Sequence, residues 1–229
     1  MSNFSIQSHC FMEESKSLFA LLRSGSVDEL ESALAQDAGL ANAINEQGVS
    51  LLLMALYMGN GEAVMLLKKY KTQLSPWEAV CTGALETLAT QIENDPSLIH
   101  ASSPDGFSLL GYACFFRHEA IARLLVDKGA DVNKPSQNAM KVAPLHSAAA
   151  ASSIVLCRLL LENGANPNAV QQGGYAPLHE AGNNGNLELG KLLLDHGANK
   201  SLLADNGESA VSLARTKGHT AAADFIEQY

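Results

Sequence analysis

Histidines are the side chains of this 229-residue chain best suited to bind a metal or to transfer protons. A zinc site needs three or four ligands brought together by the fold, and motifs such as HExxH place two of them one helical turn apart. No HExxH or other close pair of candidate ligands occurs in the sequence. His146 and His179 lie 33 residues apart inside closely similar segments. That spacing indicates a repeated structural role rather than a metal site.

The sequence also lacks the motifs of a serine nucleophile and of a phosphate-binding loop. No serine lies in a GxSxG motif, and the glycines of "GNGEAV" (59–64) and "GGYAP" (173–177) lack the lysine and strand context of a phosphate-binding loop. Adjacent carboxylates such as Asp28 and Glu29 are typical of solvated helix starts. We therefore expect no catalytic residue, no cofactor and no metal.

Charge and composition narrow the class of partner. The chain is 47% hydrophobic, carries a formal net charge of −9 and has a pI of about 5.2. Binding to nucleic acid or to an anionic membrane surface depends on clustered Lys and Arg. The densest basic group is Lys68, Lys69 and Lys71, which is too small for either role. We expect no nucleic acid and no membrane among the partners.

The cysteines and the N-terminus indicate a reducing compartment. The four cysteines are far apart and have no CxxC spacing, so we expect them to be reduced and packed as small hydrophobic residues: Cys10, Cys81, Cys114 and Cys157. The N-terminus lacks the basic and apolar regions of a signal peptide, and no apolar stretch is long enough to span a membrane. We expect a cytoplasmic protein.

An internal repeat defines the structural elements. "APLHSAAAASSIVLCRLLLENGAN" begins at Ala143, and "APLHEAGNNGNLELGKLLLDHGAN" begins 33 residues later at Ala176. Similar segments open at Ser108 and Ser209. Upstream, "GSVDELESALAQDAGLANAINEQGVSLL" from Gly25 aligns with "GALETLATQIENDPSLIHASSPDGFSLL" at a constant offset of 58 residues. The pattern predicts seven repeats, opening near Lys16, Ser50, Leu74, Ser108, Ala143, Ala176 and Ser209.

Each repeat has the same layout. A short apolar helix is followed by a tight turn, a second helix with leucines at helical spacing and a C-terminal glycine, and then a polar loop. One such helix pair cannot bury its own apolar face, so neighbouring repeats must stack. The step from Ser50 to Leu74 is short, so the chain should turn from "LLKKY" directly into Pro76 without a loop finger. We expect one elongated, curved stack with no second core.

The motifs resemble the ankyrin repeat family. "APLHSA", "APLHEA" and "LLVDKGADVN" carry the resemblance in the second half, and the first three repeats match by spacing more than by motif. The resemblance implies an all-α solenoid over residues 16–229, with short loop or hairpin fingers, preceded by a cap segment at 1–15. The opening Thr of the family is Ala at 143 and 176, which removes a capping hydroxyl worth about 1 kcal/mol each. In the family the motif histidine, here His146 and His179, bonds to the backbone of the adjoining loop.

The resemblance also implies a function. Ankyrin arrays usually bind proteins through a concave groove, using exposed residues late in the first helix and the residue before each opening motif. Carried over by position, these sites hold the candidate protein-binding residues: Tyr57, Met58, Phe107, Phe115, Phe116, Val142, Tyr175, Asn183 and Asn184. Phe115 should face the groove and Phe116 the neighbouring repeat, with Cys114 buried. We expect a monomeric adaptor, scaffold or inhibitor.

Three different interpretations stay open at this point. The aromatic residues could instead fill gaps between irregular repeats, in which case they are core. The chain could be a secreted effector that acts on host proteins, since ankyrin arrays occur in that context. It could also be an atypical enzyme or ligand-binding protein on a repeat scaffold.

The N-terminal segment generates a first test. Phe11 and Met12 precede the first evident helix, and a terminal repeat needs a cover for its apolar face. We expect these residues to fold back over the first repeat. Deleting residues 1–14 should lower the melting temperature by several degrees, and an unchanged melting curve would count against the cap.

Overall fold

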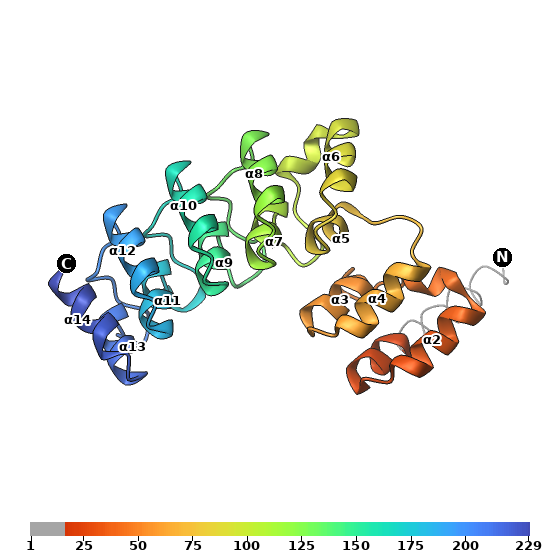
Figure 1. The fold of residues 1–229 in the computed structure, drawn as a ribbon, viewed down its shortest axis with the longest axis horizontal. Coiled ribbons are helices and arrows are strands. Elements are labelled where there is room, and N and C mark those ends of the chain that lie inside the picture. The colour runs from red at the N-terminus through yellow and green to blue at the C-terminus, as the bar shows by residue number, and fades with distance from the viewer. Residues whose placement is uncertain (1–16) are drawn as a thin grey trace. The chain divides into compact units, whose positions relative to one another are not determined.

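The computed structural model describes residues 17–229. Within these residues the regular elements are helices, and extended pairing is limited to isolated bridges such as that between Ser102 and Ser108. The predicted all-α class is confirmed (Figure 1). The proposed cap residues Phe11 and Met12 lie outside the described residues, as does Cys10.

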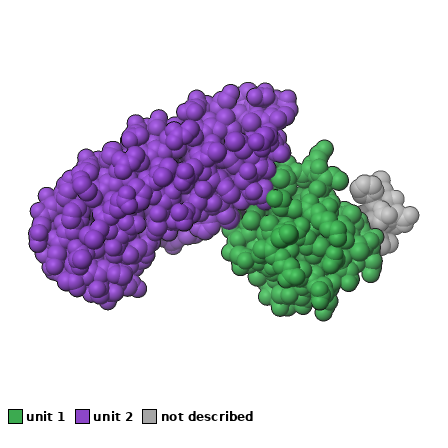
Figure 2. All heavy atoms as spheres, in the orientation of Figure 1, with its two compact units in different colours: residues 1–78 green, residues 79–229 purple. Residues whose placement is uncertain are grey.

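The chain divides into two compact units, residues 1–78 and 79–229 (Figure 2). The first unit contains helical residues 17–24 and four further elements: α2 (Val27–Gln36), η1 (Ala38–Asn42), α3 (Leu51–Tyr57) and α4 (Gly61–Tyr70). Its fully buried leucines, including Leu30, Leu34 and Leu52, belong to a hydrophobic cluster formed by residues of this unit alone. The expectation of a stack with no second core is therefore wrong.

The chain passes from α4 to α5 through a short junction. Helix α4 ends at Tyr70, and α5 (Pro76–Cys81) begins at Pro76, as predicted. The described residues 68–75 form no bridge, so no loop finger interrupts the step between the two helices. Without a finger, this junction cannot supply the loop-to-loop hydrogen bonds that join successive helix pairs in the second unit.

The second unit consists of helix pairs in two rows (Figure 1). Helices α7, α9, α11 and α13 pack side by side, and α8, α10, α12 and α14 form the other row. The elements that follow α5 in this unit are α6 (Leu85–Asn94), η2 (Pro96–His100), α7 (Leu109–Phe115), α8 (Glu119–Asp127), α9 (Pro144–Ala150), α10 (Ile154–Glu162), η3 (Gln172–Gly174), α11 (Pro177–Asn184), α12 (Leu187–Asp195), α13 (Ala210–Thr216) and α14 (Thr220–Gln228).

Helix starts coincide with the openings read from the sequence. The hydroxyls of Ser50, Ser108 and Ser209 accept hydrogen bonds from backbone N–H groups three residues on, at 3.2, 3.0 and 3.1 Å. These are the expected serine caps. Ala143 and Ala176 also precede helices, α9 and α11, but offer no side-chain acceptor.

Backbone hydrogen bonds link successive loop tips of the second unit. The Gln137 N–H donates to the Gly106 carbonyl, the Gln172 N–H to the Met140 carbonyl and the Asp205 N–H to the Gly173 carbonyl, each at 2.8 Å. These bonds join each loop tip to the next one along the stack.

The cysteines and the C-terminal helices behave as the sequence indicates. Cys81, Cys114 and Cys157 are buried, and none of the three is in a disulfide. Burial raises the pKa of Cys114, and it raises that of Cys157 to about 12, so both remain thiols at neutral pH. Six polar residues of the last helix pair are predicted to form the outer face of a terminal cap: Arg215, Lys217, His219, Asp224, Glu227 and Gln228. Five of them are exposed, whereas His219 is partly buried at the turn between the two helices.

A buried ion pair fastens the junction to the first unit. Lys71 Nζ lies 2.9 Å from Glu78 Oε1, and the two side chains are 4% and 2% exposed. Lys71 also donates to the Ala41 carbonyl, and Glu78 accepts from the Ser50 hydroxyl at 2.7 Å. Removing one member would leave the other charge buried and unpaired, which is the costly case for an ion pair.

This network generates a stability test. We expect Lys71→Met to lower the free energy of unfolding by about 3–5 kcal/mol. The matched control is Lys69→Met, because the Lys69–Glu31 pair is 66% and 50% exposed and should be worth no more than about 1 kcal/mol. Urea unfolding can be followed by the fluorescence of Trp77, the only tryptophan. Equal effects of the two variants would contradict the assignment.

Candidate interaction groove

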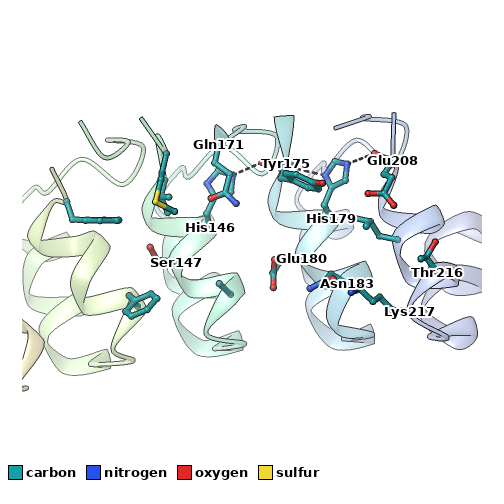
Figure 3. Close-up of a pocket in the computed structure, with 17 residues that line it drawn as sticks. His146, Ser147, Gln171, Tyr175, His179, Glu180, Asn183, Glu208, Thr216 and Lys217 are labelled. Atoms are coloured by element: carbon teal, nitrogen blue, oxygen red, sulfur yellow. Dashed lines mark hydrogen bonds between the residues drawn. The ribbon is translucent and has the colours of Figure 1, made fainter. Parts of the chain in front are cut away.

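A groove of about 600 Å³ lies in the second unit. Its walls are the first helices α7, α9, α11 and α13 together with the loops that precede them (Figure 3). These are the elements that the repeat pattern assigns to a concave surface. The groove thus results from stacking, because no single helix pair contributes more than a short section of it.

Five of the nine candidate residues line this groove: Phe107, Phe115, Val142, Tyr175 and Asn183. Phe115 is 51% exposed although the preceding residue of α7, Cys114, is fully buried. The last residue of α7 is therefore directed out of the packed seam, as predicted. The other four lining candidates are partly buried.

The remaining candidates lie elsewhere. Phe116 is half-buried and does not line the groove. Asn184 is exposed, and its amide donates to Glu180 Oε1 at 2.8 Å. Tyr57 and Met58 belong to the first compact unit, where they are 38% and 44% exposed at the end of α3. The role of all nine as protein-binding residues stays a prediction.

Aromatic contacts hold Phe115 and Phe116 in different environments. The two rings meet edge to face, with centroids 5.1 Å apart. The Phe116 ring also stacks on His118 at 6.4 Å and lies 6.5 Å from Tyr112, which is itself buried. Phe116 thus packs against its own repeat on several sides, and this support presents Phe115 to solvent.

His146 and His179 connect each first helix to the next loop. The Nδ1 atom of His146 accepts from the Ala143 N–H at 3.3 Å, so Nε2 carries the proton and donates to the Tyr175 carbonyl at 3.2 Å. His179 repeats the arrangement with the Ala176 N–H and the Glu208 carbonyl (Figure 3). The loop contacts agree with the role implied by the family. The bond at Nδ1 satisfies the N–H of the residue before the helix, which is a different donor from the one that the missing threonine hydroxyl would bind.

Several lining residues were not among the candidates. Met140 is 51% exposed and lies two residues before Val142, in a loop that is two residues longer than its neighbours. Glu208 and Lys217 occupy the same positions in the last repeat as Tyr175 and Asn184 in the preceding one. Their places were readable from the repeat, although the candidate set contained no charged residue.

The chemistry of the groove is that of a binding surface. Aromatic and methionine side chains concentrate around α7 and α9, whereas Glu180, Glu208 and Lys217 lie around α11 and α13. Among the described residues, no group of three or more His, Cys, Asp or Glu side chains is placed to hold a metal ion. No helix in the described part of the chain is long and apolar enough to cross a membrane.

Helix pairs stacked in register, with loop tips joined by backbone bonds, define a helical repeat solenoid. The family model for ankyrin repeats (three copies) matches residues 77–171 and 145–228. These matches cover more than half of the chain, and the protein belongs to the ankyrin repeat family. No curated protein shows significant similarity to the chain. The count of seven repeats stays a prediction, because the matches begin at residue 77.

The buried imidazole of His146 generates a pH test. Burial lowers the pKa of His146 below its usual value, although the hydrogen bond to the Tyr175 carbonyl acts in the opposite direction. The folded state therefore binds a proton less readily than the unfolded chain, whose histidines titrate near pH 6.5. The contribution of neutral His146 to the free energy of unfolding is therefore fully present above about pH 6.5, and it is lost as the pH falls below that value.

The expected slope can be measured directly. Between pH 7.5 and 5, one histidine can lower the free energy of unfolding by at most about 1.4 kcal/mol per pH unit. Urea unfolding of the native chain should show a steeper loss on acidification than unfolding of His146→Gln, which cannot titrate. The comparison uses slopes, so any constant destabilisation by the substitution cancels. Parallel slopes would refute the assignment.

Proposed function

We propose that this protein is a non-catalytic interaction module that binds a protein partner through the groove of its second unit. Ankyrin repeats are generally protein–protein interaction modules, and the groove supplies the surface such a role requires. The proposal includes action as a monomer in the cytoplasm, as an adaptor, scaffold or inhibitor.

The exposure of Phe115 is the observation that carries the proposal. A phenylalanine left half in water forgoes part of the roughly 1.5–3 kcal/mol that full burial would contribute. Here it stands beside the exposed Met140 and the partly buried Phe107 and Val142. Aromatic residues and methionine are enriched at the centres of protein interfaces. A gap-filling role requires buried rings, and it suits Phe116 better than Phe115.

A secreted effector would use the same groove, so it differs from the proposal in location rather than in binding mode. An enzyme finds less support in the groove. An enzyme would need a nucleophile, an acid–base pair or a cofactor site in the groove. The two lining histidines already bond to the backbone through both ring nitrogens.

A single substitution separates an interface residue from a core residue. We expect Phe115→Ala to change the free energy of unfolding in urea by less than about 1 kcal/mol, because exposed positions tolerate truncation. The same change should weaken binding to the partner by about 2 kcal/mol, the scale of an interface hot spot. A loss of stability of about 3–5 kcal/mol would instead assign Phe115 to the core.

The partner needed for this measurement can be captured with a photoreactive side chain. The chain carries a photo-crosslinking phenylalanine analogue at position 115, and a matched control carries it at Val155. Val155 is 49% exposed on α10 but does not line the groove. Proteins from the native organism that crosslink at 115 and not at 155, identified by mass spectrometry, are the candidate partners. Equal crosslinking at both positions would argue against the groove.

A further inference from the structure

Helix α9 has the smallest side chains of the four helices that form the groove. Residues three apart in a short helix lie on the same side of it. In α9 two such residues, Ser147 and Ala150, both line the groove. The equivalent positions of the other first helices hold larger residues: Tyr112 and Phe115 in α7, Glu180 and Asn183 in α11, and Leu213 and Thr216 in α13. The groove is therefore recessed at α9, and Ser147 and Ala150 are the floor of this α9 recess.

Larger side chains lie around the α9 recess. Phe115 has in α7 the position that Ala150 has in α9, and α7 packs directly against α9. The loop that leads into α9 contributes Met140 and Val142, and the loop that leads into α11 contributes Tyr175. Phe115 and Met140 are each 51% exposed. The α9 recess thus has a floor of small residues and walls of aromatic and apolar side chains.

Hydrogen bonds hold both loops that supply walls. The Val142 N–H donates to the Ser136 hydroxyl at 2.8 Å. The Tyr175 carbonyl accepts from His146 at 3.2 Å, which places this loop beside the residue that precedes Ser147. The α9 recess is therefore formed in the free chain, and less binding energy is lost in ordering it when a partner arrives.

One polar atom belongs to the floor of the recess. Ser147 is 3% exposed, and its side chain lines the groove (Figure 3). Its hydroxyl has no hydrogen bond to a described residue, whereas the hydroxyl of Ser153, equally buried in the same repeat, accepts from the Leu156 N–H. A partner that covered the Ser147 hydroxyl with apolar atoms alone would leave it unpaired, and that weakens binding.

The charged side chains of the groove belong to later repeats. Glu180 has the position of Ser147 one repeat further on, and it accepts a hydrogen bond from Asn184 at 2.8 Å. Glu208 and Lys217 belong to the last repeat. The floor and walls of the α9 recess carry no formal charge, so the recess favours an uncharged side chain.

We propose that the α9 recess binds a tyrosine or tryptophan side chain of the partner, with its ring against Phe115 and Met140 and its O–H or N–H donating to the Ser147 hydroxyl. Both side chains combine a large apolar ring with a hydrogen-bond donor, and both are enriched among interface hot spots. Phenylalanine or leucine would contact the same walls but leave the hydroxyl unpaired. The inference rests on the proposed function and adds which side chain of the partner the groove selects.

The test uses peptides selected on the full-length chain. A random-peptide phage library is panned against it, and the enriched sequences are synthesised together with copies that lack only the donor. In these copies tyrosine becomes phenylalanine, and tryptophan becomes benzothienylalanine, in which sulfur replaces the indole N–H. We expect tyrosine or tryptophan in the enriched sequences. Fluorescence anisotropy should show about tenfold weaker binding of the copies, as expected for the loss of one hydrogen bond.

Ser147→Ala tests whether the donor and the hydroxyl act together. The substitution removes a buried hydroxyl that has no partner in the free chain, so the melting temperature should equal or exceed that of the unmodified chain. On this variant, peptides with and without the donor should bind within about twofold of each other. A ring that only contacts the walls would keep the same ratio of affinities on both chains.

A larger side chain on the floor tests the recess itself. Ala150 is exposed, so Ala150→Leu should leave the melting temperature unchanged while it fills the recess and weakens peptide binding by about tenfold or more. The matched control is Thr216→Leu, because Thr216 is exposed at the equivalent position of α13 and also lines the groove. We expect this control to bind the peptides as the unmodified chain does.

The outcomes separate this inference from the proposed function. Enriched peptides without tyrosine or tryptophan, no enrichment at all, full affinity of the copies without the donor, or an unchanged ratio on Ser147→Ala would overturn it. Equal losses from Ala150→Leu and Thr216→Leu would overturn it as well. Self-association in light scattering that Ala150→Leu abolishes would do the same, because the occupant would be a second copy of the chain.

Phe115→Ala then distinguishes the two claims. If it weakens every selected peptide and the donor has no effect, the groove function stands and the tyrosine or tryptophan assignment fails. If it leaves all of them unchanged, the proposed function fails.

Discussion

Successive helix pairs of the second unit bury their leucines against one another, and the remaining features depend on that packing. Leu109, Leu125, Leu156 and Leu193 are fully buried although each belongs to a different helix. A single pair has one apolar face and no partner for it, so each repeat is stable only between neighbours. The spacing imposed by this core is then repeated at the loop tips, where backbone bonds of 2.8 Å join one loop to the next. The histidine bridges add a second connection from each helix start to the following loop.

Stacking also decides which side chains remain available for binding. Adjacent residues on a helix point about 100° apart, so a short helix packed on two sides has one direction left open. In α7 the packed directions take Tyr112 and Cys114, and Phe116 lies against Tyr112 and His118. Phe115 takes the open direction. The groove is therefore formed by positions that the core does not need, and their residue types can vary without loss of the fold.

The sequence predicted the helical repeats well because glycine, serine and leucine recur at fixed spacing. It located Ser50, Ser108, Ala143, Ala176 and Ser209 as the residues before first helices, and it placed Pro76 at the start of α5. The separate core of the first unit could not be predicted, since buried leucines recur at the same spacing whichever neighbours they pack against. The Ala143 and Ala176 bonds to imidazole were also missed, because the motif suggested the bond to the loop but not the second ring nitrogen.

The position of the groove was predictable from the sequence, whereas the residues that line it were less so. Carrying over the exposed positions identified Phe115 and Tyr175, whereas Glu208 and Lys217, which occupy equivalent places, were left out of the candidates. Met140 was missed because the longer loop moves it away from the residue that precedes the helix. The positive φ of Arg117 and Lys141 was not predicted, since the sequence alone does not give the backbone conformation of a basic residue at a turn.

Backbone conformation at the turns is the feature that the sequence pattern leaves least certain. A repeat protein has many copies of each turn, and the glycines in the other copies show which residue the backbone favours at that place. Arg117 and Ser152 keep the positive φ of those glycines with an ordinary side chain. Because a left-handed conformation costs an ordinary residue about 1 kcal/mol or more, these two turns are less favourable than their glycine counterparts and depend on the packing of the helices on either side.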